Sequence, residues 1–372
     1  MRVAIITESF LPRINGVTNS VCRVLEHLAL RGHEAIVIAP GPGPTSYAGH
    51  PVVLVPGVPL PVNASFVVGL PTSRVERTLH EFGPDVVHLA SPFALGAAGA
   101  TAARRLQVPA VAVFQTDVAG FARRYRLVGT GTAIWSWLRH IHDQAHRTLA
   151  PSSATTAQLV ARGFSRVALW GRGVDLGQFS PGHRDEGLRR SLAADGTVLI
   201  GYVGRLAPEK QVHHLRQAAG LPGTRLVLVG DGPAQRRLRR LLPGAAFLGC
   251  LGGLELSRAY ASLDVFAHTG ANETFCQAVQ EALASGVPAV APAAGGPLDL
   301  IAPGRTGLLY PPADPAALRA AVAALAADPR LRTTMGATAR QSVLGRSWQA
   351  VGDELLGHYA AVTAGDAPRA AA

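Results

Sequence analysis

The chain is poor in lysine and in cysteine, and each shortage narrows the class of protein. One lysine stands against 34 arginines, and only three residues are cysteine. Cys22, Cys250 and Cys276 are an odd number without metal-type spacing, which argues against a disulfide framework and for a reducing compartment. The apolar stretch before Glu8 is too short for a secretory signal. We therefore expect a cytoplasmic protein.

Acidic residues and long apolar runs are also scarce. The chain has 24 acidic against 35 basic residues and a net charge of +11. This excess predicts an anionic partner, either nucleic acid, an acidic lipid surface or a phosphorylated small molecule. Nucleic acid is disfavoured because the arginines occur as short dispersed pairs with little aromatic interleaving. The uncharged stretch between Asp85 and Arg104 is broken by proline and glycine, so it is not a membrane span.

Short apolar runs recur along the chain, several of them with helical stretches between. They lie at residues 3–7, 35–39, 52–55, 85–89 and 110–114, and again at 198–203, 226–229, 246–248, 265–267 and 288–291. Runs that are apolar at consecutive positions are typical of parallel strands covered on both faces. The two series predict an α/β protein with two doubly wound, Rossmann-like domains. We expect these domains to face a central cleft that holds the ligand at the strand ends.

A polar, turn-forming segment at 179–186 separates the two series and is typical of a domain linker. We place the domains at 1–183 and 184–345. A last helix at 346–363 is expected to return to the first domain. Residues 364–372 are expected to form a disordered tail.

The single lysine lies in a glycine turn after a predicted strand. Lys210 follows Gly204 and Arg205, directly after the run at 198–203. Lysine is a slim point charge that the broader guanidinium cannot always replace against a phosphate. A strand, a glycine turn and two cations are typical of the anion sites of open α/β sheets. The alternative is a lysine retained by chance on a solvated face.

Two further loops contain glycines that lie before predicted helices. Asn15 and Gly16 lead into the first helix. A glycine there lets the backbone approach a ligand closely, and the unpaired N–H groups at the start of the helix favour a phosphate. Asn-Gly is also a common turn. Residues 229–235 contain two glycines but lack the third glycine of the dinucleotide fingerprint, which disfavours a nicotinamide enzyme.

Two carboxylates frame one predicted helix in the second domain. We expect Asn272 to cap a helix that begins at Glu273 or Thr274 and that Gly286 closes. Glu281 then lies about 12 Å along the axis from Glu273, which argues against one acid/base pair. Glu273 can accept hydrogen bonds from sugar hydroxyls and Glu281 from a ribose diol. The alternative for Glu281 is a solvated helix face.

These motifs resemble the GT-B glycosyltransferases of the retaining group with a Glu-x7-Glu motif, glycosyltransferase family 4. Glu273 and Glu281 match the motif, and Asn15-Gly16, Gly204-Arg205 and Lys210 match its loops. The similarity covers nearly the whole chain. Among these enzymes, the chain most resembles the bacterial GDP-mannose-dependent α-mannosyltransferases of glycolipid synthesis. This resemblance lies in the amino-acid sequence of residues 8–12, 89–92, 273–277 and 345–348.

The resemblance implies a donor site in the second domain and an acceptor side in the first. Arg205 and Lys210 would hold the diphosphate and Glu281 the ribose. Glu273 and the amides after it would hold the sugar. The implied donor-binding residues are Gly16, Asn15, Thr274, Phe275, Cys276, Glu281 and, near the base, Cys250. Two cations and a helix N-terminus can stabilise the departing diphosphate, so we expect no metal and no cofactor besides the donor substrate, GDP-mannose.

One position departs from the family. Many relatives have a histidine where this chain has Gln115, and glutamine cannot take a proton at neutral pH. We expect Gln115 to contact the sugar, while the departing phosphate oxygen accepts the proton on the same face. Asp117 is a candidate acceptor-side carboxylate, with the capping of a turn as the alternative. Arg123 and Tyr125 complete the acceptor-side candidates.

The predicted function is retaining transfer of mannose to a lipid-linked acceptor by a peripheral protein at the inner face of the plasma membrane. Residues 59–68 are uncharged, and residues 123–126 with Arg139 and His140 place cations beside aromatics, which suits an anionic interface. Trp135 and Trp137 point to nearly opposite sides of a helix, so at most one can lie in an interface. Ordinary core packing is the alternative for both tryptophans.

Two other functions stay open. One is a GT-B transferase that uses another nucleotide sugar, such as a UDP sugar, or a soluble acceptor. The other is a nucleotide-binding regulator that has lost transfer. The residue types near Cys250 do not distinguish guanine from uracil.

Overall fold

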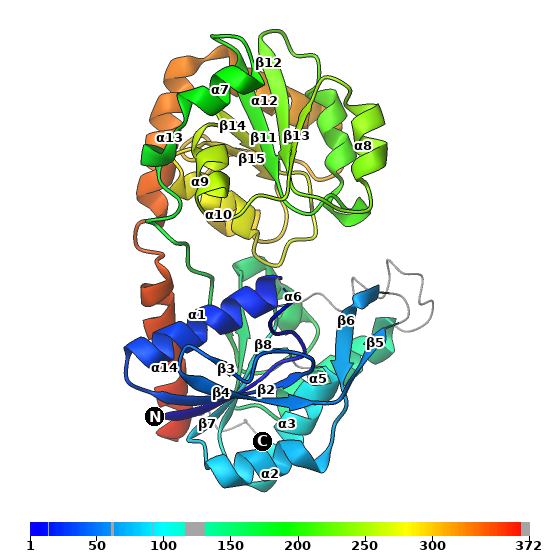
Figure 1. The fold of residues 1–372 in the computed structure, drawn as a ribbon, viewed down its shortest axis with the longest axis vertical. Helices are drawn as coiled ribbons and strands as arrows, with labels where there is room; N and C mark the ends of the chain where they lie inside the picture. Colours follow the sequence, from blue (N-terminus) through cyan, green and yellow to red (C-terminus); the bar gives the residue numbers. More distant parts are fainter. Residues whose placement is uncertain (14, 61–62, 92, 116–130, 366–372) are drawn as a thin grey trace. The chain divides into compact units, whose positions relative to one another are not determined.

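The computed structural model describes residues 1–13, 15–60, 63–91, 93–115 and 131–365 (Figure 1). The chain divides into two compact units. The first unit comprises Met1–Arg172 and Trp348–Ala372, and the second comprises Gly173–Ser347. Each is described by itself, and each is an α/β unit built on a mainly parallel sheet, as the two series of apolar runs predict.

The large sheet of the first unit has the strand order β10-β9-β8-β7-β1-β2-β4-β3. Its strands are β1 (Arg2–Ile6), β2 (Glu34–Pro40), β3 (Ser46–Tyr47), β4 (His50–Val55), β7 (Val86–Leu89), β8 (Ala110–Val113), β9 (Arg147–Ala150) and β10 (Val167–Leu169). All neighbours pair in parallel except β3 and β4. Strands β1, β2, β7 and β8 are almost wholly buried, which explains their unbroken apolar sequences.

The helices of the first unit are α1 (Gly16–Leu30), α2 (Ser73–Phe82), α3 (Ala94–Arg105), α5 (Gly131–Asp143), α6 (Ser153–Ala161) and α14 (Trp348–Thr363). A hairpin of β5 (Gly57–Leu60) and β6 (Asn63–Gly69) stands beside the main sheet. Helix α1 buries Val21, Leu25 and Leu28, the face that its periodicity predicts.

Helix α14 completes the core of the first unit although it comes last in the chain. Tyr359 is fully buried, and its hydroxyl lies 2.5 Å from Nδ1 of His88 on β7. Trp170 donates from Nε1 to the Val351 carbonyl over 3.0 Å. The first unit is therefore built from two separate stretches of chain.

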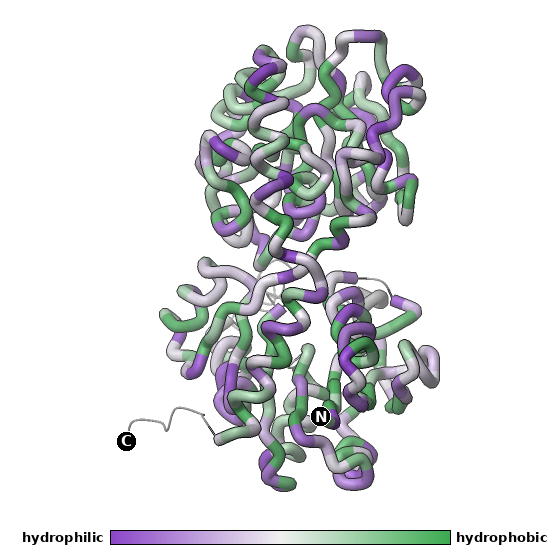
Figure 2. Tube along the Cα trace, turned by 90° about the vertical axis from the view of Figure 1, so that its left-hand side faces the viewer, coloured by the Kyte–Doolittle hydropathy of each residue, from purple (hydrophilic) through white to green (hydrophobic). Residues whose placement is uncertain are grey.

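The sheet of the second unit is parallel throughout, in the order β13-β12-β11-β14-β15-β16. Its strands are β11 (Val198–Val203), β12 (Thr224–Val229), β13 (Ala246–Gly249), β14 (Val265–Ala267), β15 (Ala289–Pro292) and β16 (Gly307–Tyr310). In Figure 2 hydrophobic and hydrophilic segments alternate along the chain within the unit. The chain order reverses between β11 and β14, which makes that pair the switch point where ligands bind in such sheets.

Helices and short 3-10 turns cover both faces of this sheet. They are η1 (Pro181–His183), α7 (Glu186–Leu192), η2 (Pro208–Lys210), η3 (Val212–Gln217), α8 (Gln235–Leu241), α9 (Gly253–Ala261), α10 (Gln277–Ala284), α11 (Pro297–Leu300), α12 (Pro315–Ala327) and α13 (Pro329–Val343). Across the ranges that the structure describes, every helix is too short or too polar to cross a membrane.

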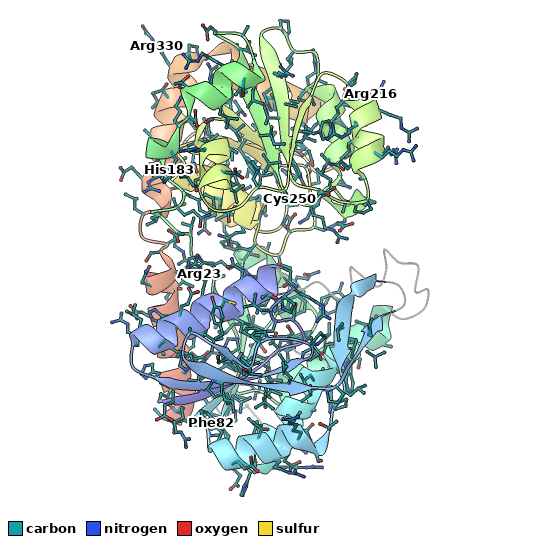
Figure 3. The ribbon with its side chains drawn as sticks, in the orientation of Figure 1. Arg23, Phe82, His183, Arg216, Cys250 and Arg330 are labelled. Carbon is teal, nitrogen blue, oxygen red and sulfur yellow. The ribbon has the colours of Figure 1, made fainter. Side chains whose placement is uncertain are left out.

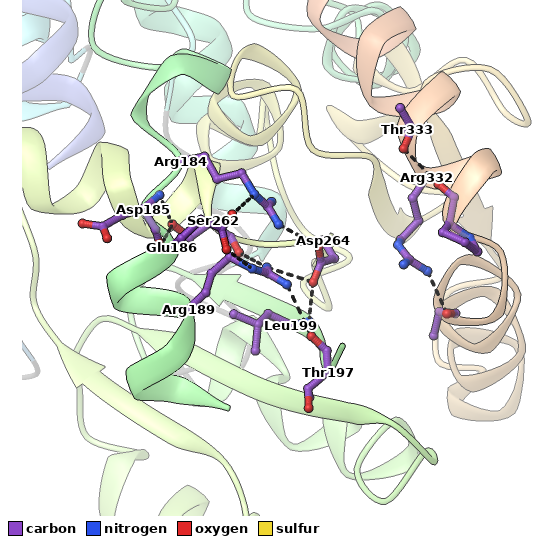
Figure 4. Close-up of polar contacts among 12 residues, drawn as sticks. Arg184, Asp185, Glu186, Arg189, Thr197, Leu199, Ser262, Asp264, Arg332 and Thr333 are labelled. Atoms are coloured by element: carbon purple, nitrogen blue, oxygen red, sulfur yellow. Dashed lines mark hydrogen bonds and ion pairs between the residues drawn. The ribbon is translucent and has the colours of Figure 1, made fainter. Parts of the chain in front are cut away.

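The boundary between the units lies at 172/173 and not near residue 183. Phe179 is buried in the core of the second unit, and Arg340 donates to its carbonyl over 2.6 Å. Arg189 of α7 binds Asp264 over 3.0 Å (Figure 4). Within the expected linker itself, the amide of Asp185 donates to Oγ of Ser262 over 3.0 Å and Arg184 lies 3.6 Å from Asp264, so this segment belongs to the second unit. The chain returns at 347/348, because the carbonyl of Arg346 still accepts from Val174 over 2.9 Å.

Candidate functional site

The loops after β11 and β14 meet at the switch point of the second sheet. These strands are paired neighbours, with Ile200 opposite Val265, so their carboxyl ends lie together. The first loop ends in the turn η2 and presents Lys210, whose Nζ donates to Oε1 of Glu273 over 2.6 Å. Thr269 fixes this loop by donating from Oγ1 to the Lys210 carbonyl over 2.7 Å.

His268 joins this pair, and the sequence analysis missed it. Its side chain is 3 % exposed, and Nε2 lies 3.2 Å from Oε1 of Glu273. The contact is an ion pair and not an aligned hydrogen bond, and Nδ1 has no hydrogen-bond partner among the described residues. Tyr202 stacks on the imidazole with centroids 6.2 Å apart. The feature of the sequence that could have identified His268 is its position directly after the apolar run at 265–267, at the sheet edge that also holds Lys210.

The three side chains form a charged cluster. Burial raises the pKa of Glu273, but the charges of Lys210 and His268 outweigh it and lower the pKa to about 2. Burial lowers the pKa of Lys210, yet the carboxylate holds it above its ordinary value. Burial also lowers the pKa of His268, whereas Cys276 and Glu273 raise it to about 10. At neutral pH Lys210 and His268 are cations beside the carboxylate of Glu273.

His268, Glu273 and Cys276 also have the donor types of a zinc site. Their ligand atoms lie within 4.8 Å of one another, and zinc accepts nitrogen, sulfur and oxygen ligands. The Lys210 ammonium, however, already occupies Oε1 of Glu273 and would repel a second cation there. These residues suit an anionic ligand better than a resident metal.

The helix after Glu273 begins later than expected. Helix α10 starts at Gln277, Cys276 is its N-cap residue with φ of 80°, and Asn272 is exposed. Glu273 therefore lies in the preceding turn, and the expected spacing along one helix is wrong. The reason is tertiary: Phe275 and Cys276 are buried, so the chain turns inward before the helix can begin.

A neighbouring backbone supports this turn. The amide of Gly296 donates to the Glu273 carbonyl over 2.9 Å. A Cβ at Gly296 would lie 1.8 Å from the Phe275 carbonyl oxygen. Only glycine permits so close an approach of the two chain segments.

Glu281 lies on α10 and is partly buried. The hydroxyl of Tyr260, a fully buried residue, donates to its Oε2 over 2.9 Å. Burial raises the pKa of Glu281 to about 7, against the opposing effect of that hydrogen bond. A carboxylate with a buried partner and a raised pKa differs from the solvated helix face that the sequence left open.

Other donor-side candidates lie outside the charged cluster. The Arg205 side chain is 53 % exposed, and its Nη1 lies 3.6 Å from Oε1 of Glu209. Cys250 is exposed directly after β13 (Figure 3). Thr274 is partly buried between Glu273 and Phe275. The roles expected of these residues stay predictions.

In the first unit, the Asn15 side chain is engaged at the start of α1, and its expected contact with the donor stays a prediction. Its Oδ1 accepts from the amides of Val17 and Thr18 over 2.9 and 3.0 Å. It caps α1, and its Nδ2 donates to Oγ of Ser9 over 2.6 Å. The amides expected to be free for a phosphate are therefore occupied by an asparagine side chain, which the sequence analysis considered only as part of a turn.

Arg172 connects two predicted residues of the first unit. It is 8 % exposed and donates to the Gly16 carbonyl and to Oε1 of Gln115, both over 2.6 Å. The Nε2 of Gln115 donates to the Ala90 carbonyl over 2.9 Å. Burial lowers the pKa of Arg172 to about 10, so it stays charged at neutral pH. No local pattern marks Arg172 in the sequence, because its partners are distant along the chain.

The acceptor-side candidates Asp117, Arg123 and Tyr125 lie outside the described residues. Of the two tryptophans, Trp135 is 7 % exposed and Trp137 is 46 % exposed. One packs inward and the other faces solvent, as their spacing on α5 predicts.

Solved structures share this arrangement of sheets. Anabaena Alr3699/HepE in complex with UDP is similar with a TM-score of 0.81 and 20% identity, covering 97% of this chain and 100% of that chain. Sucrose-phosphate synthase from Thermosynechococcus elongatus gives a TM-score of 0.79 at 21% identity, covering 98% and 99%. The two Rossmann-like units and their strand order define the GT-B fold of glycosyltransferases.

Sequence comparison narrows the class. Residues 14–178 match Glycosyltransferase Family 4, and residues 184–342 match Glycosyl transferases group 1. A GDP-mannose-dependent alpha-mannosyltransferase of Mycobacterium tuberculosis is 54% identical over 369 residues, 97% of each chain. A GDP-mannose-dependent alpha-mannosyltransferase of Corynebacterium glutamicum is 48% identical, covering 98% of this chain and 90% of that protein. The chain belongs to glycosyltransferase family 4 and is an enzyme of that family.

Proposed function

We propose that the protein transfers mannose from GDP-mannose to a lipid-linked acceptor, with retention of configuration and without a metal ion. The observation that carries this proposal is the 54% identity, over almost the whole length, to a GDP-mannose-dependent alpha-mannosyltransferase. The cluster at the switch point supports it, because two cations beside one carboxylate suit a ligand that combines a diphosphate with a sugar.

In this proposal the charged groups of the site bind different parts of the donor. The ammonium of Lys210 has three donors, so it can keep its bond to Glu273 and also bind a phosphate oxygen. Arg205, exposed and held loosely by Glu209, turns to the same diphosphate. Glu273 accepts from a sugar hydroxyl through its second oxygen. Glu281, oriented by Tyr260, accepts from the ribose.

The chemical step needs no protein base. Both ends of the Gln115 amide are engaged, with Arg172 and with the Ala90 carbonyl, and an amide takes no proton at neutral pH. The bond from the sugar C1 to the phosphate oxygen breaks, and the acceptor hydroxyl oxygen bonds to C1 on the same face. The hydroxyl proton passes to the departing phosphate oxygen. Lys210 and Arg205 stabilise the charge that develops on the diphosphate.

A lipid-linked acceptor requires contact with a membrane surface. The net charge of +11 and the exposed Trp137 on α5 support a peripheral association with an anionic bilayer. Co-sedimentation with vesicles rich in anionic lipid at low salt tests this part. Failure to sediment while GDP still binds would contradict it.

The donor and the reaction are tested together. Calorimetry with GDP, UDP and ADP is expected to give tightest binding for GDP. GDP-mannose with membrane lipid is expected to release GDP, and without lipid much less. Binding without turnover would favour the regulator, and turnover with a UDP sugar would favour another donor. The anomeric configuration of the product checks retention, and unchanged turnover in a chelator checks metal independence.

A further inference from the structure

The first unit has a surface pocket of about 680 Å³ between α5 and the end of α6. Its wall includes Thr132, Trp135, Ser136 and Arg139 from one face of α5, and Arg162 and Gly163 after α6. The four α5 positions follow the spacing of one helix face. None of the described lining residues is acidic. The pocket is therefore lined by hydrogen-bond donors, and its charge is positive.

Its two arginines converge without a carboxylate. Arg139 lies against Gly163, since a Cβ there would be 3.1 Å from its Nη1. Arg162 stands over the Trp135 ring, 4.1 Å from the centroid. Within the described part of the chain, neither guanidinium makes an ion pair with an acidic side chain. Both side chains are exposed, so solvent screens the repulsion between them and their charges are accessible to an anion.

A buried tryptophan forms part of the pocket wall. Trp135 is 7 % exposed, and its ring is held by stacking on Phe114, with an interplanar angle of 13°. Its Nε1 is shielded from solvent, so the tryptophan supports Arg162, which lies over its ring, and does not itself donate to a ligand in the pocket.

We propose that this pocket binds a phosphate group, at a site separate from the Lys210–Glu273 cluster of the second unit. A tetrahedral phosphate offers enough acceptor oxygens for two guanidinium groups and the hydroxyls of Ser136 and Thr132. The phosphate comes either from a lipid headgroup or from solution. The inference does not depend on the transfer reaction proposed above.

The test uses the full chain saturated with GDP, so that the second unit does not compete for phosphate. Inorganic phosphate and glycerol 3-phosphate are titrated by calorimetry. Arg139→Gln and Arg162→Gln are each expected to weaken binding about tenfold or more, since each removes a charge-assisted hydrogen bond. Arg330→Gln is the matched control, because Arg330 is exposed on the second unit (Figure 3). It is expected to leave phosphate binding unchanged.

Further variants keep the inference falsifiable. Trp135→Leu removes the aromatic ring beneath Arg162 and is expected to weaken phosphate binding. Arg139→Lys retains the positive charge and is expected to keep part of the phosphate affinity. Lys210→Ala is expected to leave this phosphate binding unchanged even if it abolishes GDP binding, which separates the pocket from the proposed donor site. Thermal melting checks that each variant is folded.

Vesicles distinguish the two sources. If phosphatidylglycerol vesicles bind, Arg139→Gln and Arg162→Gln reduce that binding more than Arg330→Gln does, and inorganic phosphate binds weakly, the ligand is a lipid headgroup. If inorganic phosphate binds as tightly as glycerol 3-phosphate and vesicles do not bind, free phosphate is the ligand. Wild-type protein that binds neither phosphate nor anionic vesicles, or an equal loss in all arginine variants, would overturn the proposal.

Discussion

The ammonium of Lys210 lies 2.6 Å from Oε1 of Glu273, so the single lysine of the chain is paired with a carboxylate that is only 14 % exposed. The pair joins two loops that are distant along the chain and that meet where the strand order reverses. Each side chain therefore affects the charge state of the other, and the pair is the first target for mutation.

Lys210→Ala is expected to reduce transfer about a hundredfold, because the charge opposite the developing phosphate charge is lost. It is also expected to lower the free energy of unfolding by about 1 kcal/mol, since Glu273 keeps only His268 as a cationic partner. Lys210→Arg keeps the charge and is the matched control for stability. Turnover and thermal melts measure the two effects. Unchanged turnover of Lys210→Ala would mean that the lysine is incidental.

His268→Gln is expected to change stability in a pH-dependent way. The folded pKa of about 10 lies above the ordinary value of 6.5, so the stabilisation is fully present below pH 6.5 and is lost as pH rises through 10. The difference in unfolding free energy between wild type and variant is therefore largest near pH 6 and smallest above pH 10. Denaturant unfolding at several pH values measures it. His213→Gln, at an exposed histidine, should show no such difference above pH 7.

The same substitution is expected to move the activity profile. Loss of the His268 cation raises the pKa of Glu273 from about 2. The acidic limb of the kcat profile then shifts to higher pH. A merely structural effect would lower kcat equally at every pH, and that result would contradict a direct influence on Glu273.

The pKa of Glu281 is expected to make folding less favourable above neutral pH. Its folded pKa of about 7 lies above the ordinary 4.5, so its contribution to stability falls as pH rises from about 4.5 to 7. Glu281→Gln is therefore expected to be more stable than wild type at pH 8, by about 1 kcal/mol, and similar to it below pH 4.5. Calorimetric melts measure this.

Glu281→Gln should also weaken GDP binding about tenfold, by loss of a charged acceptor for the ribose. Tyr260→Phe is the companion variant. It removes the hydrogen bond that opposes the raised pKa, so the loss of stability should extend to higher pH. Equal pH dependence in wild type and Glu281→Gln would contradict this assignment.

Gly296→Ala is expected to displace the turn that holds Glu273, because the new Cβ would lie 1.8 Å from the Phe275 carbonyl oxygen. Binding of the sugar donor should weaken tenfold or more, about 1.4 kcal/mol, with a smaller effect on GDP, which lacks the sugar. Gly244→Ala is the control, since nothing lies within 4 Å of a Cβ there. If both variants bind the sugar donor with similar affinity, donor binding does not depend on the close approach of Gly296 to the Phe275 carbonyl.

The sequence predicted ten of the strands, missed β3, β5, β6, β9, β10 and β16, and predicted the loop geometry poorly. The run at 198–203 coincides with β11, because a strand buried on both faces leaves a continuous apolar signature. The start of α10 was wrong because burial of Phe275 overrides a favourable cap at Asn272. His268 and Arg172 act through partners far along the chain, and pairwise contacts of that kind leave no local pattern.

The place of α14 has a consequence for biosynthesis. The cavity that Tyr359 fills in the first unit stays open until the last helix has been translated. The second unit is continuous in the chain and can close earlier on the ribosome. The segment made first is therefore the one that matures last, and until then its core lacks the residues that α14 contributes, so apolar surface that favours aggregation is exposed.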